Sequence, residues 1–197
     1  ADPPLVWGWY EWRRMKVLQA QPNPAHVAIA ELARHVPRLT LVTQNVDDLH
    51  ERAGSTDVIH LHGSLHQPRC FSCGERPNTP LGMPDEPEGG RRLEPPRCIA
   101  CSAKLRPGVV WFGESLPTEA LNTAFAAAET CDLLISVGTS GMVYPAAEVP
   151  GLAWRAGAVV VHVNPQPNTD HSEREFALAG LAGEQLPPLV ELAFGDR

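Results

Sequence analysis

The sequence contains little of what would place a protein in a membrane or on a nucleic acid. No apolar run approaches the roughly 18 residues of a membrane-spanning helix, and no charged leader precedes an apolar segment. The net charge is -7, from 16 Lys and Arg against 23 Asp and Glu, whereas nucleic-acid binding depends largely on cationic side chains. We therefore expect a cytoplasmic protein that binds neither membranes nor nucleic acids, and we expect it to be a monomer.

A glycine-rich phosphate turn is also missing, because no Gly-x-Gly-x-x-Gly occurs in the chain. Such a turn holds the pyrophosphate of a dinucleotide at the start of a helix. The length of 197 residues and the apolar content of 43% nevertheless suffice for one full-sized domain with a small addition.

Only five cysteines are present, and four of them form two Cys-x-x-Cys pairs, Cys70 with Cys73 and Cys98 with Cys101. In an unexported protein this spacing favours a zinc site with four thiolates over disulfides. Four thiolates complete a tetrahedron and leave no open position for a substrate, so we expect structural zinc. We predict that the fifth cysteine, Cys131, is a buried core thiol.

The segment around these pairs, residues 67–106, has little apolar periodicity. Its middle, residues 77–96, is rich in proline, glycine and charge and could not hold a fold alone. We expect the metal to substitute for the missing core, and we expect residues 83–92 to be disordered.

Short apolar runs alternate with helical patterns elsewhere in the chain. The runs predict strands at 39–42, 58–63, 108–114, 133–137 and 158–163, and the helical patterns cover 5–19, 24–35, 118–129, 145–156 and 187–194. Thr118 is the expected N-cap of its helix. This alternation indicates an α/β fold with a Rossmann-like parallel sheet and helices on both faces, plus a small zinc-binding and helical module. The predicted Rossmann-like domain comprises residues 20–66 and 107–197, and the small domain comprises 5–19 and 67–106.

Polar side chains gather where two predicted strands end. The run at 39–42 leads into the segment 43–47 (TQNVD), and the next run ends in residues 60–63 (HLHG). Ligand sites of open α/β sheets lie at the carboxyl ends of strands, so amide, carboxylate and imidazole groups should face one space. Asp47 or Asp48 could cap a short helix that runs through Arg52 and is closed by Gly54. The alternative is that the histidines only end a strand and the Asn-Asp pair only makes a turn.

Residues 43–50 (TQNVDDLH), followed by His60-x-His62-Gly63, resemble the core signature of the sirtuins, the NAD-dependent protein deacylases. The resemblance implies that His62 is the general base and that Asn45 and Asp47 act in the nicotinamide-ribose pocket. It also implies a set of nucleotide-binding residues: Gln44, Asn45, Val46, Asp47, Gly138, Thr139, Ser140, Asn164, Pro165 and Ala182. The resemblance covers nearly the whole chain.

Three of the implied nucleotide segments lie where a strand gives way to a turn. The segment Gly138-Thr139-Ser140 follows an apolar run, and its small residues would let a ligand approach the backbone closely. Asn164-Pro165 resembles the family's contact to the adenosine ribose, and the loop 180–183, which contains Ala182, resembles the one that packs on adenine.

The segment 109–114 (VVWFGE) resembles the sirtuin strand that pairs with the backbone of the substrate peptide, so Val110, Phe112 and Gly113 become candidate substrate-binding residues. The alternative is that the apolar members are ordinary core residues; both can hold, since alternate side chains of a strand face opposite ways.

Tyr10 and Arg13 are three residues apart, which places them side by side on one face of the first predicted helix. A phenol and a guanidinium so arranged could bind a carboxylate. The Tyr-x-x-Arg pattern resembles that of the bacterial-type sirtuin branch that removes succinyl and malonyl groups from lysine. Arg14 is an alternative ligand, and the tryptophans of this helix are predicted to form a packing face.

The sirtuin Gly-Ala-Gly-x-Ser turn is absent, and we expect that a leading segment is omitted from the sequence. The resemblance implies that the acyl oxygen of acyl-lysine attacks the ribose of NAD, nicotinamide leaves, and His62 accepts a proton from a ribose hydroxyl. Two other functions stay open. One is a plain deacetylase or ADP-ribosyltransferase of the same fold, and the other is a non-catalytic zinc-ribbon binding module.

Overall fold

The computed structural model describes residues 2–77, 81–167 and 173–195. The chain divides into two compact units. Unit 1 consists of Ala1–Gln21, Thr43–Leu49 and His62–Leu116, and unit 2 consists of Pro22–Val42, His50–Leu61 and Pro117–Arg197. The predicted domain boundaries, which assign residues 43–49 to the Rossmann-like domain, stay a prediction.

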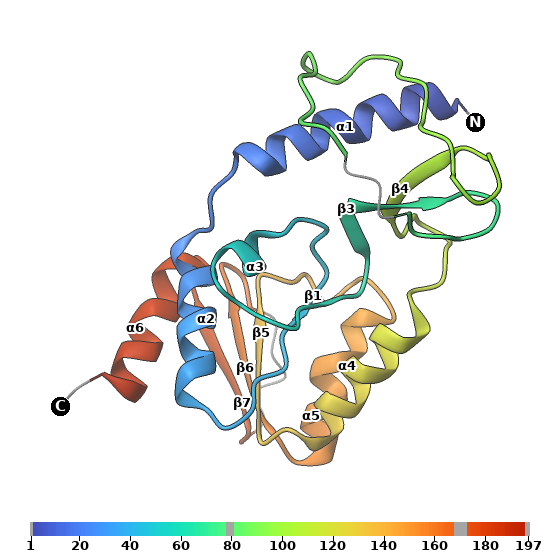
Figure 1. The fold of residues 1–197 in the computed structure, drawn as a ribbon. Helices are drawn as coiled ribbons and strands as arrows, with labels where there is room; N and C mark the ends of the chain where they lie inside the picture. Colours follow the sequence, from blue (N-terminus) through green and yellow to red (C-terminus); the bar gives the residue numbers. More distant parts are fainter. Residues whose placement is uncertain (1, 78–80, 168–172, 196–197) are drawn as a thin grey trace. The chain divides into compact units, whose positions relative to one another are not determined.

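Unit 2 contains a parallel sheet with the strand order β5-β6-β7 (Figure 1). The strands are β5 Leu133–Val137, β6 Val159–Asn164 and β7 Glu175–Ala179. Leu133 pairs with Val159 and Val160 pairs with Glu175. The predicted parallel sheet is thus confirmed, but β7 was not predicted. Among the described residues β7 pairs only with β6, and its Phe176 is exposed.

Helices pack on both faces of this sheet, as predicted. Val163 packs with α2 Pro24–His35 and α6 Ala182–Phe194, while Val160 packs with α4 Thr118–Thr130 and α5 Val149–Ala156. Val160 and Val163 are three residues apart, so their side chains point to opposite faces. Both are fully buried, and the core of unit 2 lies in two apolar layers.

Helix α2 has the predicted bounds because its start is strongly encoded. Asn23 accepts hydrogen bonds from the backbone N–H groups of Ala25 and His26, and the His26 ring accepts one from the N–H of Asn23. This capping box gives His26 a structural role. Pro24 occupies the first turn, where its missing N–H costs nothing.

Three other helix predictions need correction. Helix α6 begins at Ala182 and not at Pro187, so that Pro187 and Pro188 lie inside it. The predicted helix 145–156 is a 3₁₀ turn, Ala146–Glu148, followed by α5. The side chain of Thr118 does not cap α4, because the N-cap is Pro117 and no side chain caps this end. A helix start at Pro187 would agree with the usual position of proline in the first turn, but α6 holds both prolines in its interior.

Two further strands contain only two residues each. They are β1 Val42–Thr43 and β2 Ile59–His60, which form their own two-stranded sheet among the described residues. The strands predicted at 39–42 and 58–63 are therefore shorter, and both begin later. The short helix α3 Leu49–Arg52 follows β1, and the side chain of Asp47 accepts from the backbone N–H of Leu49 at 3.1 Å. Of the two predicted capping residues, Asp47 fills the role.

Unit 1 is built from helix α1 Pro3–Gln19 and an antiparallel pair of strands, β3 Gly63–Cys70 and β4 Leu105–Val109. Gly63 pairs with Val109 and Cys70 with Leu105. Strand β3 was not predicted, and the strand predicted at 108–114 is wrong in its bounds. Gly108 lies so close to β3 that a Cβ there would stand 1.7 Å from the carbonyl oxygen of Gln67.

The core of unit 1 is small and consists of Trp7, Cys70, Cys98 and Leu105. Of the tryptophans of α1, Trp7 packs in this core, as predicted. Residues 83–92, expected to be disordered, form irregular chain next to α1. Arg91 is paired with Glu86 at 2.9 Å, and Leu93 donates to the carbonyl of Pro4 at 3.0 Å. Residues 78–80 of the predicted loop lie outside the described ranges.

Cys131, at the C-cap of α4, is half-buried rather than fully buried. Its Sγ donates to the carbonyl of Ala128 at 3.4 Å, and burial raises the pKa of the thiol. In the part of the chain that the structure describes, no helix has the length and apolarity to cross a membrane.

Candidate active site

His62 lies in the turn between β2 and β3, and its ring is fixed by the segment that the sequence analysis paired with it. Its Nδ1 is 2.9 Å from the backbone carbonyl oxygen of Gln44. A carbonyl can only accept, so the neutral ring must carry its proton on Nδ1. Nε2 then keeps its lone pair, which is the arrangement that a general base requires.

The backbone of residues 43–49 is held by short-range bonds and by β3. The N–H of Asn45 donates to the hydroxyl of Thr43 at 3.1 Å, and the N–H of Leu65 donates to the carbonyl of Val46 at 2.9 Å. Asp47 faces back to α3, as described above. Unit 1 therefore brings Gln44, Asn45, Val46 and Asp47 into one loop that also holds His62.

The segment after β4 is a turn and not the predicted strand. The N–H of Val110 donates to the carbonyl of His62 at 2.8 Å, Phe112 is fully exposed, and Gly113 has a left-handed φ of +85°. The side chain of Glu114 accepts from the N–H of Trp111 at 2.9 Å. This turn connects the candidate peptide-binding residues directly to the candidate base.

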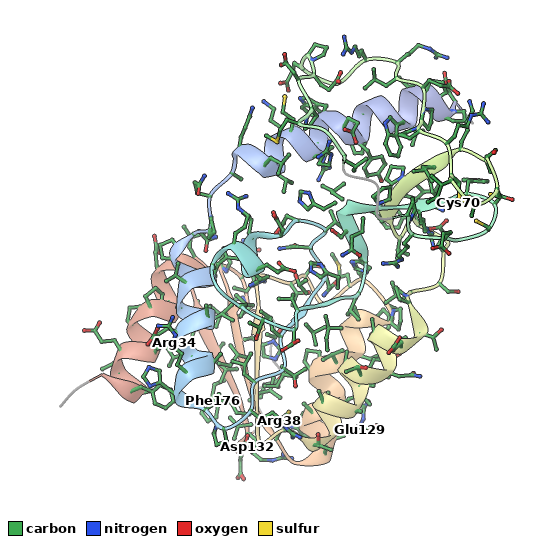
Figure 2. The ribbon with its side chains drawn as sticks, in the orientation of Figure 1. Arg34, Arg38, Cys70, Glu129, Asp132 and Phe176 are labelled. Atoms are coloured by element: carbon green, nitrogen blue, oxygen red, sulfur yellow. The ribbon has the colours of Figure 1, made fainter. Side chains whose placement is uncertain are left out.

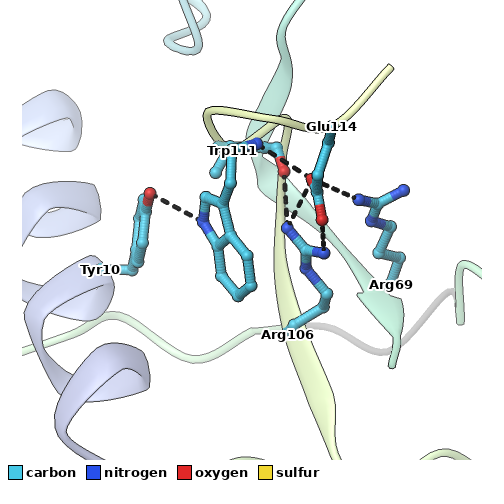
Figure 3. A network of polar contacts seen from close by, with 6 residues as sticks. Tyr10, Arg69, Arg106, Trp111 and Glu114 are labelled. Atoms are coloured by element: carbon cyan, nitrogen blue, oxygen red, sulfur yellow. Dashed lines mark hydrogen bonds and ion pairs between the residues drawn. The ribbon is translucent and has the colours of Figure 1, made fainter. Parts of the chain in front are cut away.

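Glu114 is the centre of a charged network that the sequence analysis missed (Figure 3). Arg106 and Arg69 both bind its carboxylate, with the Arg69 contact at 3.0 Å. The hydrogen bond from Arg106 is the largest cause that lowers the pKa of Glu114, with help from the N–H of Trp111 and the nearby arginine charges. Arg106 itself is buried in β4. The only available signal was an arginine inside an apolar strand, followed by a carboxylate after a glycine turn.

Tyr10 and Arg13 lie on α1 with different degrees of exposure. The hydroxyl of Tyr10 accepts a hydrogen bond from the indole Nε1 of Trp111 at 3.0 Å (Figure 3). Arg13 is exposed, and its guanidinium lies 5.1 Å from the ring centroid of Trp9. Arg14, the alternative ligand, is buried and paired with Glu11 at 2.8 Å. Arg14 thus has a structural role, and Arg13 is the arginine available to a ligand.

The remaining predicted nucleotide residues belong to unit 2. Gly138 follows β5 with a φ of +61°, and its N–H donates to the carbonyl of Val163 at 2.9 Å. The side-chain amide of Asn164 donates to the carbonyl of Thr139 at 2.9 Å. This bond joins the ends of β5 and β6, where Ser140 and Pro165 also lie. Ala182 is the first residue of α6.

The four predicted zinc ligands, Cys70, Cys73, Cys98 and Cys101, come together in the structure. Cys70, labelled in Figure 2, is the last residue of β3. The sulfur atoms of the four cysteines all lie within 4.8 Å of one another. Three of the Sγ–Sγ distances are 3.4 Å for Cys70 and Cys101, 3.6 Å for Cys73 and Cys101, and 3.8 Å for Cys73 and Cys98. Zinc–sulfur bonds of about 2.3 Å in a tetrahedron give sulfur separations of about 3.8 Å. The donor set and its spacing therefore fit zinc.

The backbone prepares one of these sulfurs for a cation. The N–H groups of Cys73 and Ser72 donate to Cys70 Sγ and lower the pKa of that thiol to about 6. The N–H of Glu75 favours the Cys73 thiolate, but the neighbouring sulfurs of Cys70 and Cys101 outweigh it and raise the pKa of Cys73 to about 12. Metal binding would therefore have to displace protons from this cluster.

Comparisons with known proteins find one family. A family model described as the Sir2 family matches residues 2–145. NAD-dependent protein deacylase 1 of Pseudomonas aeruginosa is 65% identical over 193 residues, which cover 98% of this chain and 77% of that protein. The NAD-dependent protein deacylase of Methylococcus capsulatus is 60% identical over 191 residues, which cover 97% of this chain and 75% of that protein.

Solved structures give the same result. A complex of a Sir2 homologue with NAD superposes with a TM-score of 0.82 at 45% identity, covering 97% of this chain and 72% of that one. A Sir2 protein bound to a propionylated peptide gives a TM-score of 0.77 at 32% identity, covering 95% and 78%. The resemblance to the sirtuins, first seen in residues 43–63, is thereby confirmed over almost the whole chain. The chain belongs to the Sir2 family, the sirtuins.

Proposed function

We propose that the protein is an NAD-dependent protein-lysine deacylase that transfers the acyl group to ADP-ribose, releases nicotinamide, and prefers acyl groups that end in a carboxylate. One observation carries the proposal: the ring of His62 is held through Nδ1 by Gln44, so that Nε2 is the basic nitrogen. Relatives at 65% and 60% identity are named NAD-dependent protein deacylases, which supports the same reaction.

Bound NAD would supply an electrophilic ribose carbon that receives the acyl oxygen. His62 would then accept a proton from a hydroxyl at Nε2, because its other nitrogen is already committed to a carbonyl. Asn45 and Asp47 would shape the nicotinamide end, and Gln44 and Val46 would contribute backbone and side-chain contacts. In unit 2, Gly138, Thr139, Ser140, Asn164, Pro165 and Ala182 would hold the nucleotide.

The peptide would bind along the turn that follows β4. Val110 is linked to His62 by a backbone hydrogen bond of 2.8 Å, so a peptide bound at Val110, Phe112 and Gly113 would be fixed relative to the base. The exposed ring of Phe112 is available for such a contact. The acyl carboxylate would be bound by Tyr10 and Arg13, which stand one helical turn apart on α1.

Zinc would be held by Cys70, Cys73, Cys98 and Cys101 and would take no part in the reaction, since four thiolates leave no open position. The same proposal includes a cytoplasmic monomer that does not bind nucleic acid. The acidic net charge of -7 supports the last point.

The test mixes the full-length protein with NAD and matched succinyl-lysine and acetyl-lysine peptides, and follows the products by mass spectrometry. Deacylation predicts an unmodified lysine peptide, nicotinamide and acyl-ADP-ribose in equal amounts. A peptide that gains the mass of ADP-ribose would favour an ADP-ribosyltransferase instead. Unchanged NAD in every mixture would favour the zinc-ribbon binding module.

A further inference from the structure

Trp111 joins two parts of unit 1 that the proposed function uses for different purposes. Its backbone lies between Val110 and Phe112 in the candidate peptide-binding turn. Its indole Nε1 donates to the hydroxyl of Tyr10, 3.0 Å away and 101 positions distant in the sequence (Figure 3). One side chain therefore links the segment that would hold the peptide to the helix that would recognise the acyl group.

The direction of this hydrogen bond is fixed by chemistry. An indole N–H can only donate, so the oxygen of Tyr10 must accept. The proton of the phenol then points away from the indole and is available to another acceptor. A carboxylate is an acceptor that carries no proton of its own when ionised. Trp111 thus occupies an acceptor position of the Tyr10 oxygen and leaves the phenol proton for an acceptor such as a carboxylate.

The indole is held in place by charged neighbours. The guanidinium of Arg106 lies 3.4 Å from the ring centroid of Trp111, and the backbone N–H of Trp111 is bound by Glu114 at 2.9 Å. Arg106 is in turn paired with Glu114. A cation over the face of an aromatic ring is attracted to it, so the ring plane is fixed by the pair. The bond to Tyr10 is therefore directed before any ligand binds.

We propose that Trp111 is a specificity-positioning residue, which directs the hydroxyl of Tyr10 toward the carboxylate of an acidic acyl group. The inference rests on the proposed function, because it requires that carboxylate to bind at Tyr10 and Arg13. It adds a residue that does not touch the acyl group and acts through Tyr10.

The first test replaces Trp111 by Phe in the full-length protein, which keeps an aromatic ring beside Arg106 and removes the N–H donor together with one of the two fused rings. A neutral hydrogen bond is worth about 0.5 to 1.5 kcal/mol, or roughly 2- to 10-fold in binding. We expect KM for the succinyl peptide to rise by about that factor while its kcat changes less, and the preference for succinyl over acetyl to fall in proportion. Trp12→Phe is the matched control, because among the described residues the indole nitrogen of Trp12 has no hydrogen-bond partner.

The second test places Trp111→Phe in a Tyr10→Phe background. Residues that act through one another show non-additive effects, so the second substitution should add nothing to the loss on the succinyl peptide. An equal loss on both peptides, or a further loss in the Tyr10→Phe background, would overturn the inference. If Trp111→Phe lowers the zinc content or melting temperature, the isosteric amino acid 3-benzothienylalanine at position 111 removes the N–H with the ring size preserved, and the same outcomes apply.

Arg13→Met distinguishes a failure of this inference from a failure of the proposed specificity for acidic acyl groups. If Arg13→Met abolishes the preference for succinyl and Trp111→Phe leaves it intact, the inference alone fails. If neither substitution changes the preference, the acidic-acyl specificity itself is wrong.

Discussion

Unit 2 buries mainly apolar side chains, among them Val163, Val160 and Ala153, and its buried polar residues are His26, Ser55 and Ser136. Unit 1 instead buries two arginines, Arg14 and Arg106, and has a small core that includes two thiols. Apolar burial is non-directional and independent of partners. A buried charge is tolerated only when it is paired, and removing one partner is strongly destabilising. We therefore expect the stability of unit 1 to depend on metal binding and ion pairs, and that of unit 2 to depend on apolar packing.

The largest expected difference between the units is their response to metal removal. Structural zinc contributes about 10 to 16 kcal/mol in small zinc domains, which far exceeds what the core around Trp7 could replace. Chelation or Cys98→Ser should therefore abolish hydrogen-exchange protection in β3 and β4 while β5 and β6 remain protected.

Leu186→Ala is the matched change in unit 2, where Leu186 is 3% exposed. We expect it to cost about 2 to 5 kcal/mol and to be insensitive to a chelator. Hydrogen-exchange mass spectrometry on both variants, with and without chelator, measures the difference. Protected β3 and β4 in a zinc-free protein would show that the two units are held by the same kind of forces.

The next largest effect is a loss of catalytic activity in unit 1 that leaves its stability unchanged. His62 is half-buried in a turn and makes one hydrogen bond to a backbone carbonyl, so His62→Ala should leave the melting temperature and zinc content near those of the parent. Loss of a positioned base should lower kcat about 100- to 10,000-fold.

His66→Ala is the control for this substitution, because His66 is another histidine of unit 1 and is paired with Asp48 at 3.4 Å. It should retain most of the activity. Comparable turnover by His62→Ala and the parent would remove His62 from the mechanism, and comparable losses in both histidine variants would point to general damage in unit 1.

The same contrast explains how much of the structure was predictable. Helix α2 was predicted with its bounds because its cap and its apolar face are both local, and the zinc site was predicted because two Cys-x-x-Cys pairs specify a ligand set. The pairing of residues 43–47 with His62 was predicted because both follow short strands. In each case a short sequence pattern carries the signal.

The parts that were missed depend on tertiary contacts. The turn after β4 was predicted as a strand because Val109, Val110 and Phe112 are apolar, but Glu114 folds back to bind Arg106 eight positions earlier and the N–H of Trp111. No local pattern encodes that return. Likewise, α6 accommodates two internal prolines because its packing against α2 and β6 outweighs their local cost.

A smaller effect is expected for acyl specificity. Arg13→Met should raise KM for a succinyl peptide about 10- to 100-fold, since a hydrogen bond to a charged group contributes about 1.5 to 3 kcal/mol. The acetyl group has no carboxylate, so the ratio of kcat/KM values for succinyl and acetyl peptides should collapse. Arg13→Lys keeps the positive charge but cannot form the bidentate contact of a guanidinium. Its KM for the succinyl peptide should therefore lie between those of the parent and Arg13→Met. Equal losses on both peptides would mean that Arg13 and Tyr10 only support α1.

The smallest expected effect is a loss of stability of unit 1 in acid, caused by protonation of Glu114 in its network with Arg106 and Arg69. The pKa of Glu114 is lowered from its ordinary value of 4.5, first by the hydrogen bond from Arg106. A carboxylate with a lowered pKa contributes stability that is complete above the unfolded value and is lost as the pH falls through the folded one. Glu114→Gln should therefore be less stable than the parent at neutral pH, and the difference should shrink below pH 4.5.

Acid also protonates the cysteine thiolates and thereby weakens zinc binding. Because this happens in parent and variant alike, the difference between their free energies of unfolding reports on the carboxylate of Glu114. Glu88→Gln serves as the control, because Glu88 is 81% exposed and its contact with Lys16 at 3.4 Å is open to solvent. Denaturant unfolding across the acid range measures both differences. A difference for Glu114→Gln that stays constant with pH would mean that the shape of this side chain, rather than its charge, orders the turn at Trp111.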